Sequence, residues 1–576
     1  MLPRSTTRCL AFCAALAAAP AAAQAPVFQE RPCEPAIEGA RCGTVQVPEN
    51  RDAPGRMLAL NVVVFPARTA APAREALASF GGGPGQAATE SADYLAVRFA
   101  ALRDDRDLLF VDQRGTGRSA PLQCPLRDPA DPQTYLGDYL PPGPVARCLE
   151  DLSRGADLTR YGYLELAHDV EAVRTALGYD RMDLWGGSYG TRAAQVYMRA
   201  YPRSVRSAVL EGVVPTGYAQ PAGYARSMDA ALAGLARDCR ADAACGAAFP
   251  DVAGQARTVA DRLARSPGTA EIVDPETGAR LRLTVTRATF ADLLRRMLYA
   301  PDAAAQIPYV VDRAHQGDVR PAARLALQDR RGYARGLYWG LNLAITCTED
   351  VPFVDAAAEA RDNGRTLLGD WRTRQQVAAC AGWPRYPLPA GYHQPVPSDV
   401  PTLLISGELD PVTPPSGGEA AAAYLRSSLH VVVPSAGHTY QGMPGAACVD
   451  SLVIRFYRQA SVRGLDASCV RDVRRPPFVI TVAEPIALDQ AALQRFAGSY
   501  AAAGPPPVQL RAEALDGVLR ITFDGGFTVI ASPIAPTVFR LEGLPPRFVL
   551  RFAEDGRSVL IPTGEGDETA TLARTP

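Results

Sequence analysis

The stretch DLWGGSYGTRAAQVY, residues 183–197, joins a short apolar run to a helix-like pattern through a Gly-Gly-Ser-Tyr-Gly turn. The turn has the spacing G-x-S-x-G, which is typical of a nucleophilic serine held on a sharp bend between a strand and a helix. Gly186 and Gly190 fit this geometry, because the strained turn and the close helix leave no room for side chains. The same spacing also arises by chance around a small residue in a tight bend. The role of Ser188 therefore depends on the rest of the chain.

A serine nucleophile needs a base, and the chain contains only five histidines. His168 falls within a predicted helix, and His430 begins a predicted strand. His315 and His393 lie in polar stretches of a mostly helical region. His438 alone follows a predicted strand, HVVVPSAGH, on a glycine turn, and this position favours it as the base.

The base needs an acid that orients it, and LLISGELDPVTP offers Glu408 and Asp410 just after a predicted strand. Asp410 is better placed, because Pro411 begins a loop and the aspartate stands beyond the strand end. Glu408 is the alternative acid, and its other interpretation is a solvated loop charge. With Asp410 the chain order is Ser, Asp, His, each after a predicted strand, as expected for a serine on such a turn in this kind of sheet.

The glycine-rich segment GGGPG, residues 81–85, also follows a predicted strand. Its backbone N–H groups at Gly82 or Gly83 are candidate donors to an oxyanion, together with the N–H of Tyr189. Taken alone, such a segment is more often a flexible turn. Its place before the serine, the aspartate and the histidine favours the catalytic interpretation.

Strand-like and helix-like runs alternate in two blocks of the chain, which predicts a mostly parallel sheet covered by helices on both faces. Between the blocks lie amphipathic helical patterns such as ATFADLLRRMLYA, so we expect an inserted helical cap over one end of the sheet. Near the C-terminus, Asp-Gly pairs separate short β-rich runs and predict hairpins. The predicted domains are a signal peptide (1–25), the first part of the α/β core (26–215), the cap (216–395), the second part of the core (396–475) and a β-rich domain (485–576).

The composition excludes several kinds of chemistry. The net charge is −1, so the chain has no basic excess to neutralise nucleic-acid phosphates. All 60 basic residues are arginine, which rules out Schiff-base lysines, a Ser–Lys dyad and a P-loop lysine, although genome composition is the simplest cause of this bias. The chain has no C-x-x-C spacing and few histidines, so we expect neither a metal nor another cofactor.

The N-terminus MLPRSTTRCLAFCAALAAAPAAAQAPVF places two arginines before an alanine-rich apolar run that ends in small residues. This is the pattern of a cleaved secretory signal peptide, and the run is too short for a comfortable membrane span. No later segment is long and apolar enough to cross a bilayer, so we expect export to the periplasm or the medium.

The cysteines also indicate export. Of the 12 cysteines, Cys9 and Cys13 leave with the signal peptide, and the other ten form neighbouring couples. An oxidising compartment would convert such couples into disulfides, although the sequence does not fix the connectivity. The couples are Cys33 with Cys42, Cys124 with Cys148, Cys239 with Cys245, Cys347 with Cys380, and Cys448 with Cys469.

Seven motifs together resemble a known family. They are GGGPG (81–85), DQRGTGRS (112–119), GGSYGT (186–191), ITCTED (345–350), CAGWP (380–384), GELDPVTP (407–414) and AGHTY (436–440). The chain resembles secreted aminopeptidases of the α/β-hydrolase fold, the group that contains tripeptidyl aminopeptidases and, more distantly, prolyl iminopeptidases. The resemblance implies an α/β-hydrolase fold and a triad of Ser188, Asp410 and His438. Gly81 stands where the iminopeptidase pattern has histidine, which favours the tripeptidyl type.

An aminopeptidase must hold the free ammonium group of its substrate, and a partly desolvated carboxylate does this through a charge-assisted hydrogen bond. ITCTED places Glu349 and Asp350 in the predicted cap, where a Cys347–Cys380 bridge would fix them over the site. Glu211, after the strand that follows the helix of the serine turn, is a further candidate. The alternative for each carboxylate is a solvated surface charge.

The sequence thus predicts an exported serine aminopeptidase that acts on peptides with a free N-terminus, without a cofactor, a nucleic-acid partner or a membrane span. Two alternatives remain at this stage. One is a carboxylesterase with the same triad, because the fold accommodates many acyl substrates. The other is a hydrolase that has lost its activity and only binds. The tail around LQRFAGSY resembles small β-barrel domains appended to other secreted hydrolases. The sequence predicts no oligomeric state.

Overall fold

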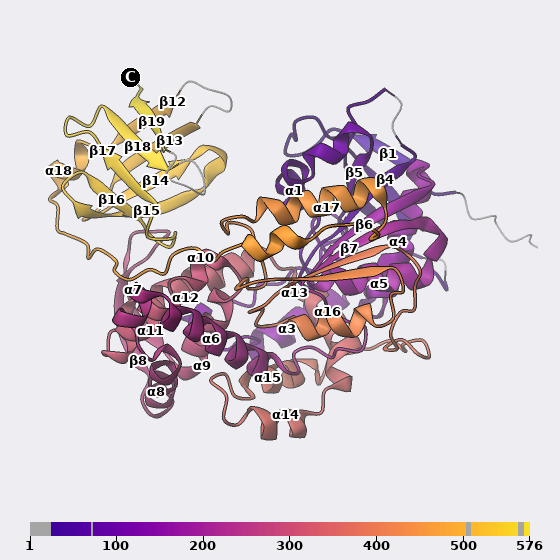
Figure 1. The fold of residues 1–576 in the computed structure, drawn as a ribbon, viewed down its shortest axis with the longest axis horizontal. Coiled ribbons are helices and arrows are strands. Elements are labelled where there is room, and N and C mark those ends of the chain that lie inside the picture. Colours follow the sequence, from indigo (N-terminus) through magenta and orange to yellow (C-terminus); the bar gives the residue numbers. More distant parts are fainter. Residues whose placement is uncertain (1–24, 54, 71–72, 503–507, 563–568, 576) are drawn as a thin grey trace, which may run out of the picture.

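The computed structural model describes residues 25–53, 55–70, 73–502, 508–562 and 569–575. The predicted signal peptide lies outside the described residues except for its last position. Figure 1 shows a core built on a large sheet, a helical cap and a small β barrel at the C-terminus. The predicted fold class, an α/β-hydrolase fold with an inserted cap and a C-terminal antiparallel β domain, is confirmed. In the described part of the chain, every helix is too short or too polar to traverse a bilayer.

The core is a nine-stranded sheet in the order β1-β2-β3-β5-β4-β6-β7-β10-β11. The pairs from β1 to β5 along this order are antiparallel, and the strands from β5 to β11 run parallel to one another. The strands are β1 (Phe28–Arg31), β2 (Arg41–Pro48), β3 (Met57–Phe65), β4 (Glu75–Phe80), β5 (Asp107–Val111), β6 (Arg181–Gly187), β7 (Val205–Glu211), β10 (Thr402–Gly407) and β11 (Ser428–Val433).

Helices cover both faces of this sheet (Figure 1). One face packs against α4 (Tyr163–Leu177), α5 (Tyr189–Ala200) and α16 (Pro415–Ala422), and the other against α1 (Ala92–Arg98) and α17 (Ala447–Gln459). All six residues of β10 are buried, which explains why this segment is an unbroken apolar run rather than an alternating one. Because parallel strands end at one edge, the loops after β4, β6, β7, β10 and β11 meet there.

The cap lies between β7 and β10 in the chain and has its own hydrophobic core. It consists of α6 (Tyr224–Ala241), α7 (Ala243–Ala248), α8 (Val252–Arg265), the hairpin β8 (Gly268–Val273) and β9 (Arg280–Val285), α9 (Arg287–Met297), α10 (Pro301–Ala304), α11 (Ile307–His315), α12 (Arg320–Arg335), α13 (Trp339–Ile345), a π-helical turn (Thr346–Asp350), α14 (Ala356–Asn363) and α15 (Trp371–Cys380). Two helices from the first part of the chain, α2 (Gln133–Leu136) and α3 (Pro142–Ser153), pack against α12 and α15. The cap is therefore built from two separate segments of sequence.

The C-terminal domain is a closed barrel of eight antiparallel strands, because β19 pairs back with β12. Its interior is filled by aromatic and aliphatic side chains, including Phe496, Phe539 and Phe552, so it is a packed core rather than a ligand cavity. The elements are α18 (Gln490–Gln494), β12 (Gly498–Ala502), β13 (Val508–Ala514), β14 (Leu519–Phe523), β15 (Thr528–Ala535), β16 (Val538–Leu541), β17 (Val549–Phe552), β18 (Ser558–Pro562) and β19 (Thr569–Arg574).

The barrel docks on the cap rather than on the sheet (Figure 1). The N–H of Ile530 donates to the carbonyl of Pro275, at the turn of the β8–β9 hairpin, over 3.1 Å. Arg547 pairs with Asp302 of α10, with one nitrogen 2.7 Å from the carboxylate. The barrel therefore contacts the cap at the β8–β9 hairpin and at α10.

Five disulfides join the cysteines in the predicted couples, so the connectivity that the sequence left open is that of nearest neighbours along the chain. Two bonds lie in or beside the sheet domain and three in the cap and its flanking helices. The bonds join Cys33 to Cys42, Cys448 to Cys469, Cys124 to Cys148, Cys239 to Cys245, and Cys347 to Cys380.

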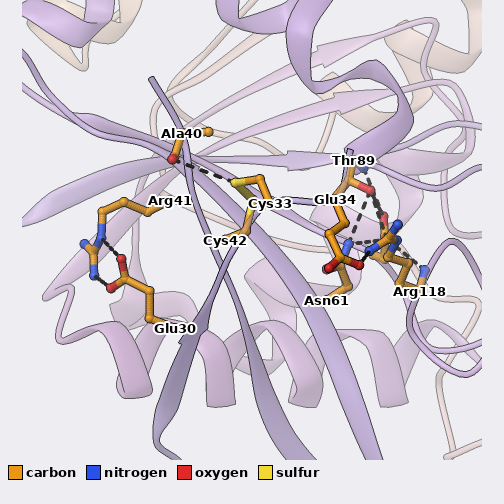
Figure 2. The surroundings of a disulfide bond; sticks show 10 residues. Glu30, Cys33, Glu34, Ala40, Arg41, Cys42, Asn61, Thr89 and Arg118 are labelled. Carbon is orange, nitrogen blue, oxygen red and sulfur yellow. Dashed lines mark hydrogen bonds and ion pairs between the residues drawn. A yellow bond between two sulfur atoms is a disulfide. The ribbon is translucent and has the colours of Figure 1, made fainter. Parts of the chain in front are cut away.

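Each disulfide fastens a short helix or a loop to a neighbouring element. Figure 2 shows the bond between Cys33 and Cys42, which ties the segment after β1 to β2 beside the ion pair of Arg41 and Glu30 at 2.8 Å. The bond from Cys124 to Cys148 attaches the loop before α2 to α3.

The remaining three disulfides act in the same way. The bond from Cys239 to Cys245 joins α6 to α7, and the bond from Cys448 to Cys469 joins α17 to the 3₁₀ turn Ser468–Asp472. Cys347 of the π-helical turn is bonded to Cys380 at the end of α15. This last bond holds the π-helical turn against α15.

Candidate active site

Ser188 stands between the last residue of β6 and the first turn of α5, with φ 54° and ψ −120°. A positive φ is strained for a residue with a side chain, and such strain is stored where the surrounding structure enforces it. A side chain at Gly186 would overlap the backbone of Gly190, and one at Gly190 would overlap the carbonyl of Phe80. Both glycines are therefore required, for the steric reason that the sequence spacing indicated.

His438 and Asp410 meet at the same sheet edge, on the loops after β11 and β10. Nδ1 of His438 lies 2.7 Å from Oδ2 of Asp410. The other oxygen of Asp410 accepts the N–H groups of Val412 and Thr413, each over 2.9 Å, and the hydroxyl of Thr413 donates to Oδ2 over 2.6 Å. Burial acts to raise the pKa of Asp410, but His438 and Thr413 outweigh it and hold the pKa below its usual value. The buried aspartate is thus kept ionised.

Glu408, the alternative acid, is exposed and does not reach the histidine. Its carboxylate accepts the backbone N–H of Ser435 over 2.8 Å, at the rim of the loop. The structure therefore pairs His438 with Asp410 rather than with Glu408.

Ser188 and His438 line one cavity of about 530 Å³, which we call the catalytic cavity. The glycine-rich segment 81–83 also lines it, as do Glu211 and Tyr299. The ring of Tyr299, from the cap, lies 4.7 Å from the ring of His438, centroid to centroid. The cap therefore closes over the histidine and bounds the space available to a substrate.

The predicted oxyanion donors lie around the serine. Gly82 and Gly83 line the catalytic cavity with Ser188. Tyr189 is the first residue of α5, where a backbone N–H has no acceptor within the helix. Its side chain points away from the cavity, stacks on Tyr163 at 4.5 Å and donates to Gln113. Only the backbone of Tyr189 is left to face a substrate.

Glu349 and Asp350 were predicted to bind the ammonium group of a substrate, and the structure places both side chains away from the catalytic cavity. Neither lines the catalytic cavity, and their exposed fractions are 0% and 1%. Glu349 accepts the N–H of Tyr163 and the hydroxyls of Tyr386 and Tyr392. Both carboxylates are therefore already bonded and inaccessible to a substrate amine.

The pKa values of these two carboxyls follow from their burial. Burial raises the pKa of Glu349 to about 7, against the lowering effect of the Tyr386 and Tyr392 hydrogen bonds. Asp350 pairs with buried Arg192 at 2.8 Å, yet burial still raises its pKa. These groups tie the cap to the start of α4 and to α5, so their role here is structural.

Glu211, the third predicted anchor, does line the catalytic cavity. Its carboxylate pairs with Arg98 at 2.7 Å, and Arg98 also pairs with Asp450 at 2.9 Å. The backbone carbonyl of Glu211 accepts the N–H of Ser188 over 2.8 Å, so this residue adjoins the serine turn directly. Arg98 is thus shared by two carboxylates, of which Glu211 lines the cavity and Asp450 does not.

Several residues at the site were not predicted from the sequence. Thr413 lies three residues after Asp410 in GELDPVTP, and that spacing of a hydroxyl after an aspartate in a loop was an available signal. The others are Arg98, Arg296, Tyr299 and Tyr333, which come from α1 and the cap and carry no local signal. Among the described residues, no three side chains of His, Cys, Asp or Glu are grouped to hold a metal ion.

The topology of the sheet and the meeting of Ser188, His438 and Asp410 at its carboxyl edge define an α/β hydrolase of the serine type. Comparison with known proteins agrees with this assignment to the serine-type α/β hydrolases. The family described as TAP-like protein matches residues 366–469, which include Asp410 and His438. These findings confirm the predicted resemblance to tripeptidyl-aminopeptidase-like hydrolases and the prediction of a serine hydrolase.

Curated relatives extend the similarity over most of the chain. Serine protease Hip1 of Mycobacterium tuberculosis is 28% identical over 472 residues, which cover 75% of this chain and 87% of that protein. Carboxylesterase B of the same organism is 27% identical over 479 residues, with the same coverage of 75% and 87%. Tripeptidyl aminopeptidase of Streptomyces lividans is 31% identical over 123 residues, or 19% of this chain and 22% of that protein.

Proposed function

We propose that the protein is an exported serine aminopeptidase, which cleaves peptides from their free N-terminus through a triad of Ser188, His438 and Asp410. The observation that carries this proposal is the His438–Asp410 hydrogen bond of 2.7 Å at the cavity that Ser188 also lines. The names of the relatives Hip1 and tripeptidyl aminopeptidase, a protease and an exopeptidase, support peptides as the substrates.

The proposed reaction follows from the three roles. His438 removes the proton of the Ser188 hydroxyl as its oxygen attacks the scissile carbonyl, and then gives that proton to the departing amine. Asp410 orients the imidazole and stabilises its charged form. The ester left on Ser188 is then hydrolysed by water, which His438 activates in the same way. The N–H groups of Tyr189 and of the 82–83 segment would stabilise the oxyanion in both steps.

An aminopeptidase must also recognise the free N-terminus of its substrate, and we assign this recognition to Glu211. This carboxylate lines the catalytic cavity, and the guanidinium that it faces, Arg98, is shared with Asp450. A carboxylate whose counter-charge is shared favours an ammonium group over a neutral, blocked N-terminus. An anchor beside Ser188 would also limit how much of the peptide lies on the acyl side of the cut bond.

Export is supported by the cysteine chemistry. Ten cysteines form five disulfides, a pattern that persists in oxidising compartments and is rare in a reducing cytosol. The signal-peptide pattern of residues 1–25 supports the same destination, the periplasm or the medium.

A carboxylesterase is the second candidate, because Carboxylesterase B matches the same share of the chain at nearly the same identity as Hip1. Ester and amide hydrolysis use the same three residues. They differ in the leaving group, since only the amine of a peptide must be protonated by His438 to depart.

Activity on matched substrates tests the proposal. Wild-type protein is expected to hydrolyse free peptide anilides with kcat/KM at least ~10-fold above the N-acetyl forms, because a charge-assisted hydrogen bond contributes about 1.5–3 kcal/mol. Glu211→Gln should remove most of this difference, and Glu408→Gln, an exposed carboxylate outside the cavity, should keep it. Equal rates on free and acetylated peptides would contradict the aminopeptidase proposal, and hydrolysis of esters alone would support the carboxylesterase.

A further inference from the structure

A second, smaller cavity of about 40 Å³ adjoins Ser188 on its cap side, and we call it the inner chamber. It shares Gly83, Ser188 and Tyr299 with the catalytic cavity. Its cap wall includes Asn342 of α13 and two residues of α15, Arg372 and Gln376. The chamber is therefore a side pocket that opens at the nucleophile.

The position of the histidine shows which half of a substrate faces this pocket. His438 lines the catalytic cavity but is not among the described residues that line the inner chamber. Since His438 protonates the leaving group, the leaving group lies on the histidine side of Ser188. The inner chamber is therefore free for the side chain of the residue whose carbonyl is attacked, while the N-terminus of the peptide lies beside Glu211 in the catalytic cavity.

The chamber wall carries excess positive charge. Arg295, Arg330 and Arg372 all act on one carboxylate, Asp292, which is fully buried. Arg295 pairs with it at 2.9 Å, and Arg330 also pairs with it. Arg372 lies over the ring of Tyr139 and forms no ion pair among the described residues. A group that enters the chamber thus meets a guanidinium whose charge is not balanced locally.

Two polar atoms of the wall lack hydrogen-bond partners among the described residues. Asn342 is 3% exposed, and its Nδ2 donates to the carbonyl of Pro84 over 3.0 Å, which leaves the buried Oδ1 unpartnered. Nε of Arg372 is also buried and unpartnered. Buried polar atoms are rarely left unsatisfied, so an unpartnered acceptor and an unpartnered donor in one small cavity indicate a polar ligand. A carboxamide pairs with both atoms, and a carboxylate pairs with the donor alone.

We propose that the inner chamber is the specificity pocket for the side chain of the residue that forms the acyl-enzyme, and that it takes a short carboxamide or carboxylate side chain, asparagine or aspartate. Arg372 would donate to the side-chain oxygen, and Asn342 Oδ1 would accept an N–H of the carboxamide. This inference rests on the proposed function, because it assumes that a peptide carbonyl is attacked by Ser188.

The size and the charge of the inner chamber together define the kind of side chain that it binds. At about 40 Å³ the chamber is far smaller than the catalytic cavity of about 530 Å³, so it suits a small side chain. The arginines of its wall repel lysine. Leucine would leave the two polar atoms of the wall buried and unpaired, which disfavours its binding.

The test measures binding without turnover, so that it does not depend on whether peptide bonds are cleaved. The probes are Ala-Ala-Asn, Ala-Ala-Asp, Ala-Ala-Ala, Ala-Ala-Leu and Ala-Ala-Lys, which represent acyl-side products, titrated calorimetrically into the full-length Ser188→Ala protein. Asn and Asp peptides should bind ~10-fold or more tightly than the other three, as expected for one charge-assisted hydrogen bond. Equal affinity for all five peptides, no binding to any of them, or a preference for the Leu or Lys peptide would overturn the assignment of the inner chamber as the specificity pocket.

Further variants of the Ser188→Ala protein test whether Arg372 causes the preference for the Asn and Asp peptides. Arg372→Met should abolish the advantage of the Asn and Asp peptides over the Ala peptide, and Arg372→Lys should retain part of the Asp advantage through its charge. Arg374→Met is the matched control, because Arg374 is an exposed neighbour on α15 that pairs with Asp370. An unchanged advantage in Arg372→Met would overturn the assignment, and Arg372→Lys decides the question if Arg372→Met fails to fold. If wild type then cleaves no peptide, the proposed function fails while the titrations still decide the pocket.

Discussion

Asp410 and Glu349 are both buried carboxylates. Asp410 lies on the loop after β10 and Glu349 in the π-helical turn of the cap, and their environments shift their pKa values in opposite directions. Asp410 is 2% exposed and its pKa is lowered, whereas Glu349 is 0% exposed and its pKa is raised to about 7. Burial acts to raise both pKa values, so the difference comes from the groups that face each carboxylate.

Asp410 faces a histidine, a hydroxyl and two backbone N–H groups within 2.9 Å. Glu349 faces two phenol hydroxyls and one backbone N–H, and Arg192, which also lowers its pKa, pairs with Asp350 instead. The charge of Asp410 is thus balanced by the groups around it, and that of Glu349 is not. This difference fits the proposed role of Asp410 as the acid that orients His438.

Removing the charge of Asp410 should have the largest effect. Asp410→Asn keeps the shape of the side chain but no longer fixes the tautomer of His438 or stabilises its charged form, so we expect kcat/KM to fall by about 10⁴. The measurement is steady-state kinetics on a free peptide anilide, with the melting temperature as a check on folding. Glu408→Gln is the matched control, and a similar loss in that variant would contradict the assignment of the acid.

Thr413 tests how far hydrogen bonding supports Asp410. Its hydroxyl donates to Asp410 over 2.6 Å and lies 3.1 Å from Nδ1 of His438. Thr413→Val removes one hydrogen bond to a charged group, worth about 1.5–3 kcal/mol, so we expect a loss in kcat/KM of roughly 10- to 100-fold. Thr413→Ser retains the hydroxyl and should recover most of the activity. Equal loss in the serine and valine variants would show that packing, not the hydrogen bond, is responsible.

Glu349→Gln should change stability rather than catalysis. The folded protein holds the proton of Glu349 up to about pH 7, whereas the unfolded chain releases it near pH 4.5. Through this window the unfolded state binds fewer protons, so the free energy of unfolding of the wild type falls as the pH rises, by up to about 3 kcal/mol. The glutamine variant lacks this dependence.

Urea unfolding between pH 4 and 8 tests this prediction. The stability advantage of Glu349→Gln over wild type should grow from pH 4.5 to 7 and then level off, with the preference for free N-termini unchanged. Asp410, with its lowered pKa, contributes in the opposite sense, and its stabilisation is lost as the pH falls. An advantage of Glu349→Gln that shrinks with rising pH, or a lost preference for free peptides, would contradict the structural role.

The parts of the site that could be predicted were those with a local pattern. The glycines around Ser188 and the order of the serine, Asp410 and His438 after successive strands are visible in the sequence because each depends on neighbouring residues. The same holds for the Asp-Gly turns of the barrel, where Gly517 between β13 and β14 has φ 76°.

The surroundings of Glu349 could not be predicted, because they come from distant segments. Tyr386 and Tyr392 lie 37 and 43 residues further along the chain, and Tyr163 lies 186 residues before it. No local pattern shows that these groups close around the carboxylate. The inner chamber was missed for the same reason, since α13 and α15 meet there only through the packing of the cap.

Covalent labelling with a fluorophosphonate, followed by peptide mass spectrometry, tests whether Ser188 is the nucleophile. We expect a single adduct on the peptide that contains Ser188, absent in Ser188→Ala and strongly slowed in Asp410→Asn. An adduct on a different residue, or equal labelling of Ser188→Ala and wild type, would contradict it.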